Sequence, residues 1–444
     1  MNKILFLTET VTFEWNQLIP IVILIAISAF IPIVLSVCRI KFIPVFVIEI
    51  LAGIILASIP LTKEMFTLDH EGVAILNALP EGLYMIGMAL LLFLSGLDTD
   101  YSVLHSKNKD KTFNVVLLSI LLFTAVVICS IGGSLIFTKY FVNQTPFTKT
   151  IGIILLVITF SSTFASVVIP LVHNAKLQHT TIGRIIGTYA TLAELIAILA
   201  LSGLMISMQI VEDSQPWLLV IAIGILLLTY VFKRFIPINF LKHNMEGIVH
   251  LNVRLIVLVL LSLVILTQTS GAEFILGAFL AGMVIKAANI SHHTMQKMES
   301  IGYGLFVPMF YILVGLKVGL TLPIYEFIKS DNLLLIGLIF AVLVITKLPL
   351  LYLMRWYKIR TVIPTMFIVT CTLIVGIAAE HFGIFKEQFT DCLIVASCLT
   401  CLIPPLFFAS SKKYGYSKDK YDEIIVNPNE VDEEGNEIIL ELPQ

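Results

Sequence analysis

Long apolar segments separated by short polar stretches run through most of the chain. A helix needs about 20 apolar residues to cross the roughly 30 Å hydrocarbon core of a bilayer. The sequence offers thirteen such segments, at about residues 16–38, 42–60, 80–99, 113–138, 149–172, 181–208, 215–236, 249–268, 270–287, 300–322, 332–354, 362–385 and 388–410. The pattern therefore predicts an all-α polytopic membrane protein with about 13 transmembrane helices.

Composition agrees with this class and excludes several others. The chain is 58% hydrophobic and only 13% charged, whereas a soluble domain has about 25% charged residues. No basic stripe with interleaved aromatic residues is present, so we expect no nucleic-acid partner. No nucleophile–base pair or metal-ligand motif recurs at a consistent depth, so we expect neither an enzyme nor a bound cofactor.

Lysine and arginine residues are distributed unequally between the two sides of the predicted membrane. If residues 1–15 lie outside, the inner loops and the tail carry twenty of them and the outer loops carry seven, which leaves Lys347 inside a span. Cytoplasmic loops carry an excess of these residues. We therefore expect the cell (inner) membrane, an extracytoplasmic N-terminus and a polar, acidic cytoplasmic tail at 412–444.

Ionisable and hydroxyl-bearing residues share one layer inside the predicted bilayer. A carboxylate at mid-membrane depth is costly and usually marks an ion or proton path. Counting about 1.5 Å per helical residue, Glu194 lies about 15 Å from the inner surface and Lys347 about 12 Å from it. Two further segments lie at similar depth, namely Ser161, Ser162 and Thr163 in the fifth span and Thr370, Cys371 and Thr372 in the twelfth.

The two hydroxyl-bearing segments are seven spans apart, so their helices run in opposite directions. This placement is typical of inverted-topology repeats, here spans 2–6 against spans 9–13, with two discontinuous helices that cross at the midplane. A broken helix offers free carbonyl oxygens from one half and a positive N-terminal dipole from the other. Alternatively, these hydroxyls only hydrogen-bond to the previous turn of their own helix.

Five segments resemble one family of transporters. They are IPVFVIEILAGIILA (43–57), MALLLFLSGLDTD (88–100), FSSTFASVVIPLV (160–172), LGAFLAGMVI (276–285) and IGYGLFVPMFYILVGLKVGL (301–320). The chain resembles the monovalent cation:proton antiporters of the second cation/proton antiporter family over residues 16–410. That resemblance implies that an acid on the helix after the Ser-Ser-Thr segment, here Glu194, binds the cation and the proton in turn.

The sequence departs from this family at two places. Relatives usually carry Asp at the position of Glu194, often after Asp, Asn or Gln, where this chain has Ala193. The twelfth span often carries an Arg-Gly-Glu-like motif, whereas this chain reads IVTCTLIVG (368–376). Both departures leave the ion preference and the stoichiometry open.

The resemblance also implies a division of labour among the helices. Helices 1–3 (16–100) and 8–10 (249–322) would form a scaffold that mediates a homodimer. Helices 4–6 (113–208) and 11–13 (332–411) would form a moving core, joined to the scaffold through helix 7 (215–236).

The expected chemistry is competition at one carboxylate. Desolvation favours the neutral form of a buried carboxyl group and a nearby cation favours the charged form, so Glu194 would hold a proton or an alkali ion but not both. Na⁺ is the expected cation, with Li⁺ and K⁺ as alternatives, and all of them need oxygen ligands. The hydroxyls of residues 161–163 would supply these. Lys347 would form an ion pair with Glu194 or compensate helix dipoles.

The predicted function is exchange of one cation for one proton by alternating access. We expect the exchange to be electroneutral, because Glu194 has no acidic neighbour, and to contribute to pH homeostasis. A sodium-coupled symporter of organic solutes with similar architecture is the alternative, and the buried Lys347 favours the antiporter over it. A channel is not favoured, because no filter loop or ring of charge recurs. Glu49, in the second span, is a candidate structural acid.

Overall fold

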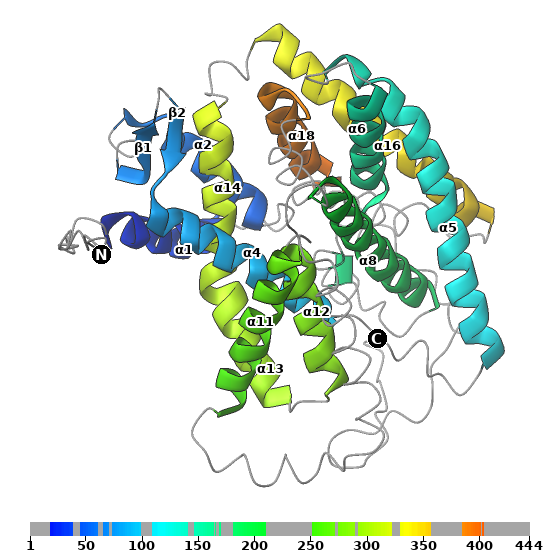
Figure 1. Ribbon diagram of the computed structural model, residues 1–444, viewed down its shortest axis with the longest axis horizontal. Coiled ribbons are helices and arrows are strands. Elements are labelled where there is room, and N and C mark those ends of the chain that lie inside the picture. Colours follow the sequence, from blue (N-terminus) through cyan, green and yellow to red (C-terminus); the bar gives the residue numbers. More distant parts are fainter. Residues whose placement is uncertain are drawn as a thin grey trace, which may run out of the picture.

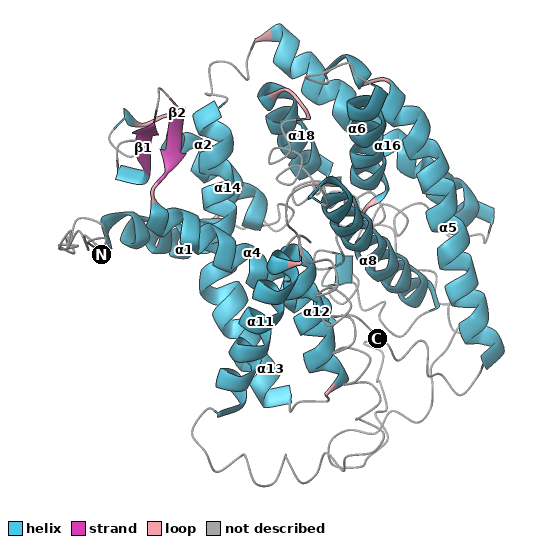
Figure 2. Ribbon diagram, viewed as in Figure 1, coloured by secondary structure: helices cyan, strands magenta, loops and turns pink. Residues whose placement is uncertain are grey.

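The computed structural model shows a helical protein in which most of the apolar segments form helices (Figures 1 and 2). The structure describes residues 18–38, 45–60, 65–70, 73–98, 109–140, 146–163, 165, 168–169, 181–209, 251–270, 274–288, 292–321, 329–356, 384–400 and 402–403. The helices pack into two groups, which meet along the face where the polar layer lies.

The first group contains the helices from residues 16–100 and 249–322, the two segments that were expected to form the scaffold. Its members are α1 (Ile19–Val37), α2 (Val45–Ala57), α4 (Ala78–Asp98), α11 (Leu251–Thr269), α12 (Phe274–Ala287), α13 (His292–Ile301), the π-helical segment η4 (Gly302–Phe306) and α14 (Val307–Thr321). Within it, α14 packs on α2 and α4, and α12 packs on α4 and α11.

The second group contains helices from the remaining segments. Its members are α5 (Lys109–Leu135), the short 3₁₀ helix η3 (Thr138–Tyr140), α6 (Pro146–Ser161), α8 (Thr181–Gln209), α16 (Ser330–Trp356) and α18 (Glu387–Thr400). Helix α5 packs on α6, α8 and α16, and α16 also packs on α18. These helices lie together on one side of the molecule in Figure 1.

Small residues bring the backbones of the first group into direct contact. A Cβ atom on Gly315 of α14 would collide with the carbonyl oxygen of Ile50 in α2. A Cβ atom on Gly96 of α4 would collide with the carbonyl oxygen of Phe279 in α12, and Gly282 of α12 faces the α4 backbone in the same way. Close approach at small residues is a main source of helix association in membranes, so α4 is held rigidly on α12.

One short element among the described residues is not helical and was not predicted. Strands β1 (Thr67–His70) and β2 (Val73–Leu76) form an antiparallel hairpin in which Thr67 pairs with Leu76. The hairpin falls in the connection between the second and third apolar runs, where no run of lipid-facing residues requires a helix. At its closed end, His70 pairs with Val73, a separation typical of a tight hairpin.

Seven helices among the described residues are long and apolar enough to cross a membrane, and several shorter apolar helices accompany them. The number of spans expected from the sequence is not established by this part of the chain. The predicted span at 215–236, most of that at 362–385 and the tail at 412–444 lie outside the described residues.

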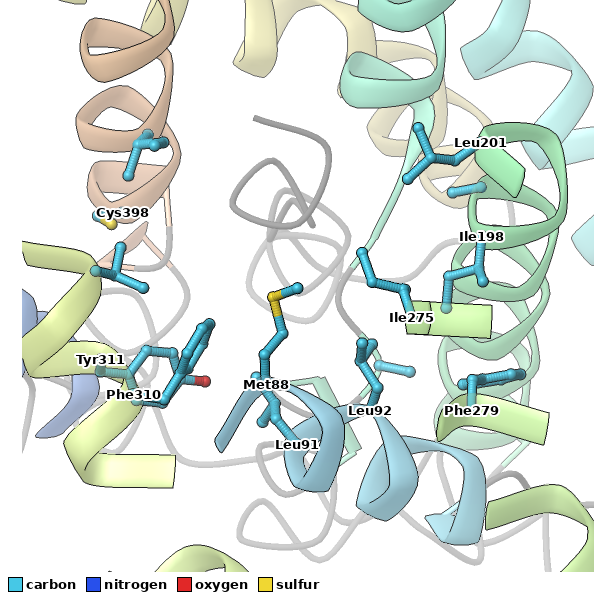
Figure 3. Packing of buried hydrophobic residues seen from close by; sticks show 14 of the residues in the cluster. Met88, Leu91, Leu92, Ile198, Leu201, Ile275, Phe279, Phe310, Tyr311 and Cys398 are labelled. Carbon is cyan, nitrogen blue, oxygen red and sulfur yellow. The ribbon is translucent and has the colours of Figure 1, made fainter. Parts of the chain in front are cut away.

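Buried apolar side chains fill the contact between the two groups. In Figure 3, Ile198 and Leu201 of α8 lie near Leu92 of α4 and Ile275 of α12. Cys398 of α18 lies near the labelled residues of α14. Contacts between α12 and α8 and between α14 and α18 join the groups. The polar groups described next are therefore enclosed by hydrocarbon side chains.

Candidate functional site

Glu194 lies near the middle of α8 and is completely buried. Small alanine residues flank it on the buried face of the helix, with Ala190 and Ala193 also inaccessible. Its Oε2 atom accepts a hydrogen bond from the hydroxyl of Ser95 at 2.7 Å and another from the backbone N–H of Ala165 at 3.1 Å. Ser95 belongs to α4 in the first group of helices, so the carboxylate lies where the two groups meet.

Lys347 is also completely buried, in α16. Its Nζ atom donates to the carbonyl oxygens of Ser161 at 2.9 Å and Ser162 at 2.8 Å, and to the hydroxyl of Thr163 at 3.1 Å. Contacts of this kind are what helix-dipole compensation, one of the two expected roles of this lysine, requires. The ammonium group lies at the C-terminal end of a helix, where the backbone is electronegative.

The helix that contains Ser161 is interrupted in the middle of the polar layer. Helix α6 ends at Ser161, Ser162 and Thr163 are not helical, and Ala165 is helical again. The two sides of the interruption face opposite charges, because the carbonyls before it accept from the lysine and the Ala165 N–H after it donates to the carboxylate of Glu194. This arrangement satisfies backbone groups that lipid could not satisfy.

The hydroxyls of the interrupted segment have different partners. Ser161 and Ser162 donate to the carbonyls of Ile158 and Thr159, one turn earlier, at 3.3 and 2.9 Å. Hydroxyls that bond to nearby carbonyls in this way compete with the helical backbone, which helps to end α6 at this point. Only the hydroxyl of Thr163 takes part in the contacts described for Lys347.

Three contributors to the site were missed by sequence reasoning. Ser95 is a single serine in the apolar run of α4, and the sequence could have suggested it only as a polar residue near mid-membrane depth. Tyr189 is fully buried on α8, with its ring centroid 5.9 Å from Nζ of Lys347, within the range of a cation–π contact. The N–H of Ala165 could not be found from side-chain chemistry, because its role depends only on the backbone.

The other predicted residues are not brought to this point by the described contacts. Glu49 is 3% exposed and lies on the buried face of α2, in the first group. The candidates Thr370, Cys371 and Thr372 fall outside the described residues, so the second predicted interruption has no structural description.

A second acid–hydroxyl contact joins the two groups. Thr321, the last residue of α14, donates to Oδ2 of Asp391 in α18 at 2.7 Å, and Asp391 is 7% exposed. The sequence did not mark this acid as a candidate, because it lies close to the start of its helix rather than at mid-membrane depth.

A buried carboxylate where two groups of membrane helices meet, and a buried ammonium group at the end of an interrupted helix, are features of secondary transporters. The comparison with known families gives the same class: residues 25–409 match the model of the transmembrane sodium/hydrogen exchanger family. The chain belongs to this family of integral membrane transporters, which is not a class of enzymes.

Individual relatives carry consistent names. The chain is 29% identical over 417 residues to the "Putative Na(+)/H(+) antiporter YjbQ" of Bacillus subtilis, covering 90% of this chain and 64% of that protein. It is 25% identical over 336 residues to the "Probable Na(+)/H(+) antiporter 3" of Methanocaldococcus jannaschii, covering 72% and 80%. It is also 28% identical over 279 residues to the "Na(+)/H(+) antiporter" of Enterococcus hirae, covering 61% and 67%.

Proposed function

We propose that this protein is a secondary antiporter that exchanges a monovalent cation, Na⁺ in the first instance, for protons by alternating access. The observation that carries the proposal is Glu194, a fully buried carboxylate at the boundary between two helix groups. An ionised carboxylate in this environment is stabilised by binding either a proton or a cation. Because one group serves both ligands, binding of one excludes the other, and this competition couples the two fluxes.

The cation would be held by oxygen atoms, as alkali ions require. We propose the carboxylate of Glu194 as the principal ligand, with oxygens of Ser161, Ser162 and Thr163 as further ligands. Lys347 fixes this segment by binding its carbonyls, and it places a positive charge near the site that opposes occupation by more than one cation. The second interrupted segment, at Thr370 to Thr372, is proposed to complete the midplane arrangement.

The two helix groups suggest how access would alternate. We propose that the first group is the scaffold and that the second is the moving core, which carries Glu194 on α8 and Lys347 on α16. Movement of the core past the scaffold would expose the carboxylate to each side in turn. The remaining proposals are a homodimer formed through the scaffold, an N-terminus outside the inner membrane, and a role in pH homeostasis.

The central experiment measures exchange in proteoliposomes that contain a pH-sensitive dye and an imposed pH gradient. Addition of Na⁺, Li⁺, K⁺ or Rb⁺ in turn should dissipate the gradient for the transported ions only. Glu194→Gln should abolish this response while the purified protein elutes as a single folded species. Glu299→Gln, which makes the same chemical change on α13 away from the site, should leave the response unchanged. Undiminished exchange by Glu194→Gln would refute the proposal.

The stoichiometry has its own measurement. One-for-one exchange is electroneutral, so a potential imposed with K⁺ and valinomycin should not change the rate of Na⁺-driven proton movement. A steep dependence on potential would show that more than one proton moves per cation. The symporter alternative predicts sodium uptake only together with an organic solute, and the names of the relatives do not favour it.

A further inference from the structure

The hydrogen bond from Ser95 to Glu194 is a contact between the two groups of helices, at the site itself. We infer that Ser95 is a positioning residue whose hydrogen bond holds the ionised, cation-free form of Glu194 against the first helix group. This hydrogen bond, called the tie below, would keep the site from crossing the membrane without a bound cation or proton. This inference rests on the proposed role of Glu194, and it adds a reason why exchange would be tightly coupled.

Ser95 is fixed in place by its own helix. Its neighbour Gly96 leaves no room for a Cβ atom against the carbonyl of Phe279, and Gly282 of α12 is equally close to the α4 backbone. Ser95 is itself completely buried, as are the apolar side chains around it on α4. The hydroxyl therefore cannot follow Glu194 if the second group moves relative to the first, so the 2.7 Å contact must break in any such movement.

The hydrogen bond depends on what the carboxylate carries. Oε2 of Glu194 accepts hydrogen bonds from both the Ser95 hydroxyl and the Ala165 N–H, so a cation that binds this oxygen competes with these donors for its lone pairs. The serine hydroxyl can turn away, whereas the backbone N–H has no such freedom. Hydrogen bonds to ionised acceptors are also about twice as strong as neutral ones, so protonation weakens the tie as well.

The tie is consequently strongest when Glu194 carries neither ligand. Loading with a cation or with a proton releases the second group, and loss of both restores the hydrogen bond. This is the condition that an antiporter must meet, because a site that returns empty turns exchange into a leak of the cation.

A different role for the same hydroxyl makes the opposite prediction. If Ser95 turned its oxygen toward the cation and served as a ligand, its removal would weaken cation binding. If Ser95 competes with the cation, its removal strengthens binding. The direction of change in KM therefore separates the two roles.

Ser95→Ala in full-length protein reconstituted into liposomes provides the test. We expect an approximately tenfold lower KM for Na⁺, the factor associated with one hydrogen bond to a charged group, with a much smaller change in maximal rate. With pH equal on both sides, ²²Na⁺ uptake driven by an inside-negative potential should rise severalfold over wild type. Ser95→Cys keeps the side chain's shape with a weaker donor and should give intermediate values.

Ser130→Ala is the matched control, because this buried serine on α5 donates only to Val126 of its own helix in the contacts described, and both of its readouts should equal wild type. A KM for Na⁺ that is unchanged or higher in Ser95→Ala, or potential-driven uptake equal to wild type, overturns the inference. Such a result leaves the proposed function intact as long as Glu194→Gln remains inactive. Active Glu194→Gln protein would instead remove the proposed function first.

Discussion

Replacing Lys347 by methionine tests whether this buried lysine stabilises the C-terminal end of α6. Methionine matches the length of the lysine stem but has no donor hydrogen. The change leaves the carbonyl oxygens of Ser161 and Ser162, which now accept hydrogen bonds at 2.9 and 2.8 Å, without that donor at the end of a helix inside a hydrocarbon environment.

The magnitude follows from two opposing terms. A buried acceptor that loses its donor costs about 1–3 kcal/mol, so two carbonyls together give about 2–6 kcal/mol. Removal of the ammonium group also relieves its own desolvation penalty, and side-chain hydrogen bonds in membranes are often weaker than expected. We therefore expect Lys347→Met to lower the free energy of unfolding by about 2 kcal/mol, near the bottom of that range.

Thermal unfolding of the purified protein in detergent, followed by intrinsic fluorescence, measures this loss. The same substitution should be made in wild-type protein and together with Glu194→Gln. If Lys347 acts mainly on the end of α6, its removal costs about the same in both backgrounds, since effects at independent sites add. If the loss in free energy of unfolding disappears when Glu194 is neutralised, Lys347 acts through an ion pair with Glu194. If Lys347→Met causes no loss in either background, the lysine does not stabilise the end of α6.

Two further substitutions test the packing of the helices. Gly315→Ala should lower the unfolding temperature by several degrees, because the added methyl group meets the backbone of Ile50. The control Gly132→Ala, whose added methyl group meets no atom within 4 Å on the exposed face of α5, should be neutral or slightly stabilising. Equal effects of the two substitutions would refute the close contact. Thr321→Val should remove the hydrogen bond to Asp391 and lower the free energy of unfolding by about 1–3 kcal/mol, measured in the same assay. A variant as stable as wild type would show that this contact between the two groups does not stabilise the protein.

The sequence alone predicted the class of this protein and singled out Glu194, which the structure places in a fully buried position. Thirteen apolar runs, their lysine and arginine asymmetry, and one carboxylate in the middle of an apolar helix were enough for this, because lipid imposes strong and local rules on which residues it tolerates. Lys347 and the segment at Ser161–Thr163 were found by the same reasoning about depth. The hairpin β1–β2 was missed, because it lies outside the region where those rules apply.

Only the tertiary structure decided which of these groups contact one another. Depth along a helix places Glu194 and Lys347 in one layer, but it does not give their rotation about the helix axis or the neighbours that face them. In the structure, Lys347 donates hydrogen bonds to the carbonyls at the end of α6, and the Glu194 carboxylate accepts hydrogen bonds from the Ala165 N–H and from Ser95. Those partners come from backbone groups and from a distant helix, and contacts of this kind are set by packing, which no local pattern in the sequence records.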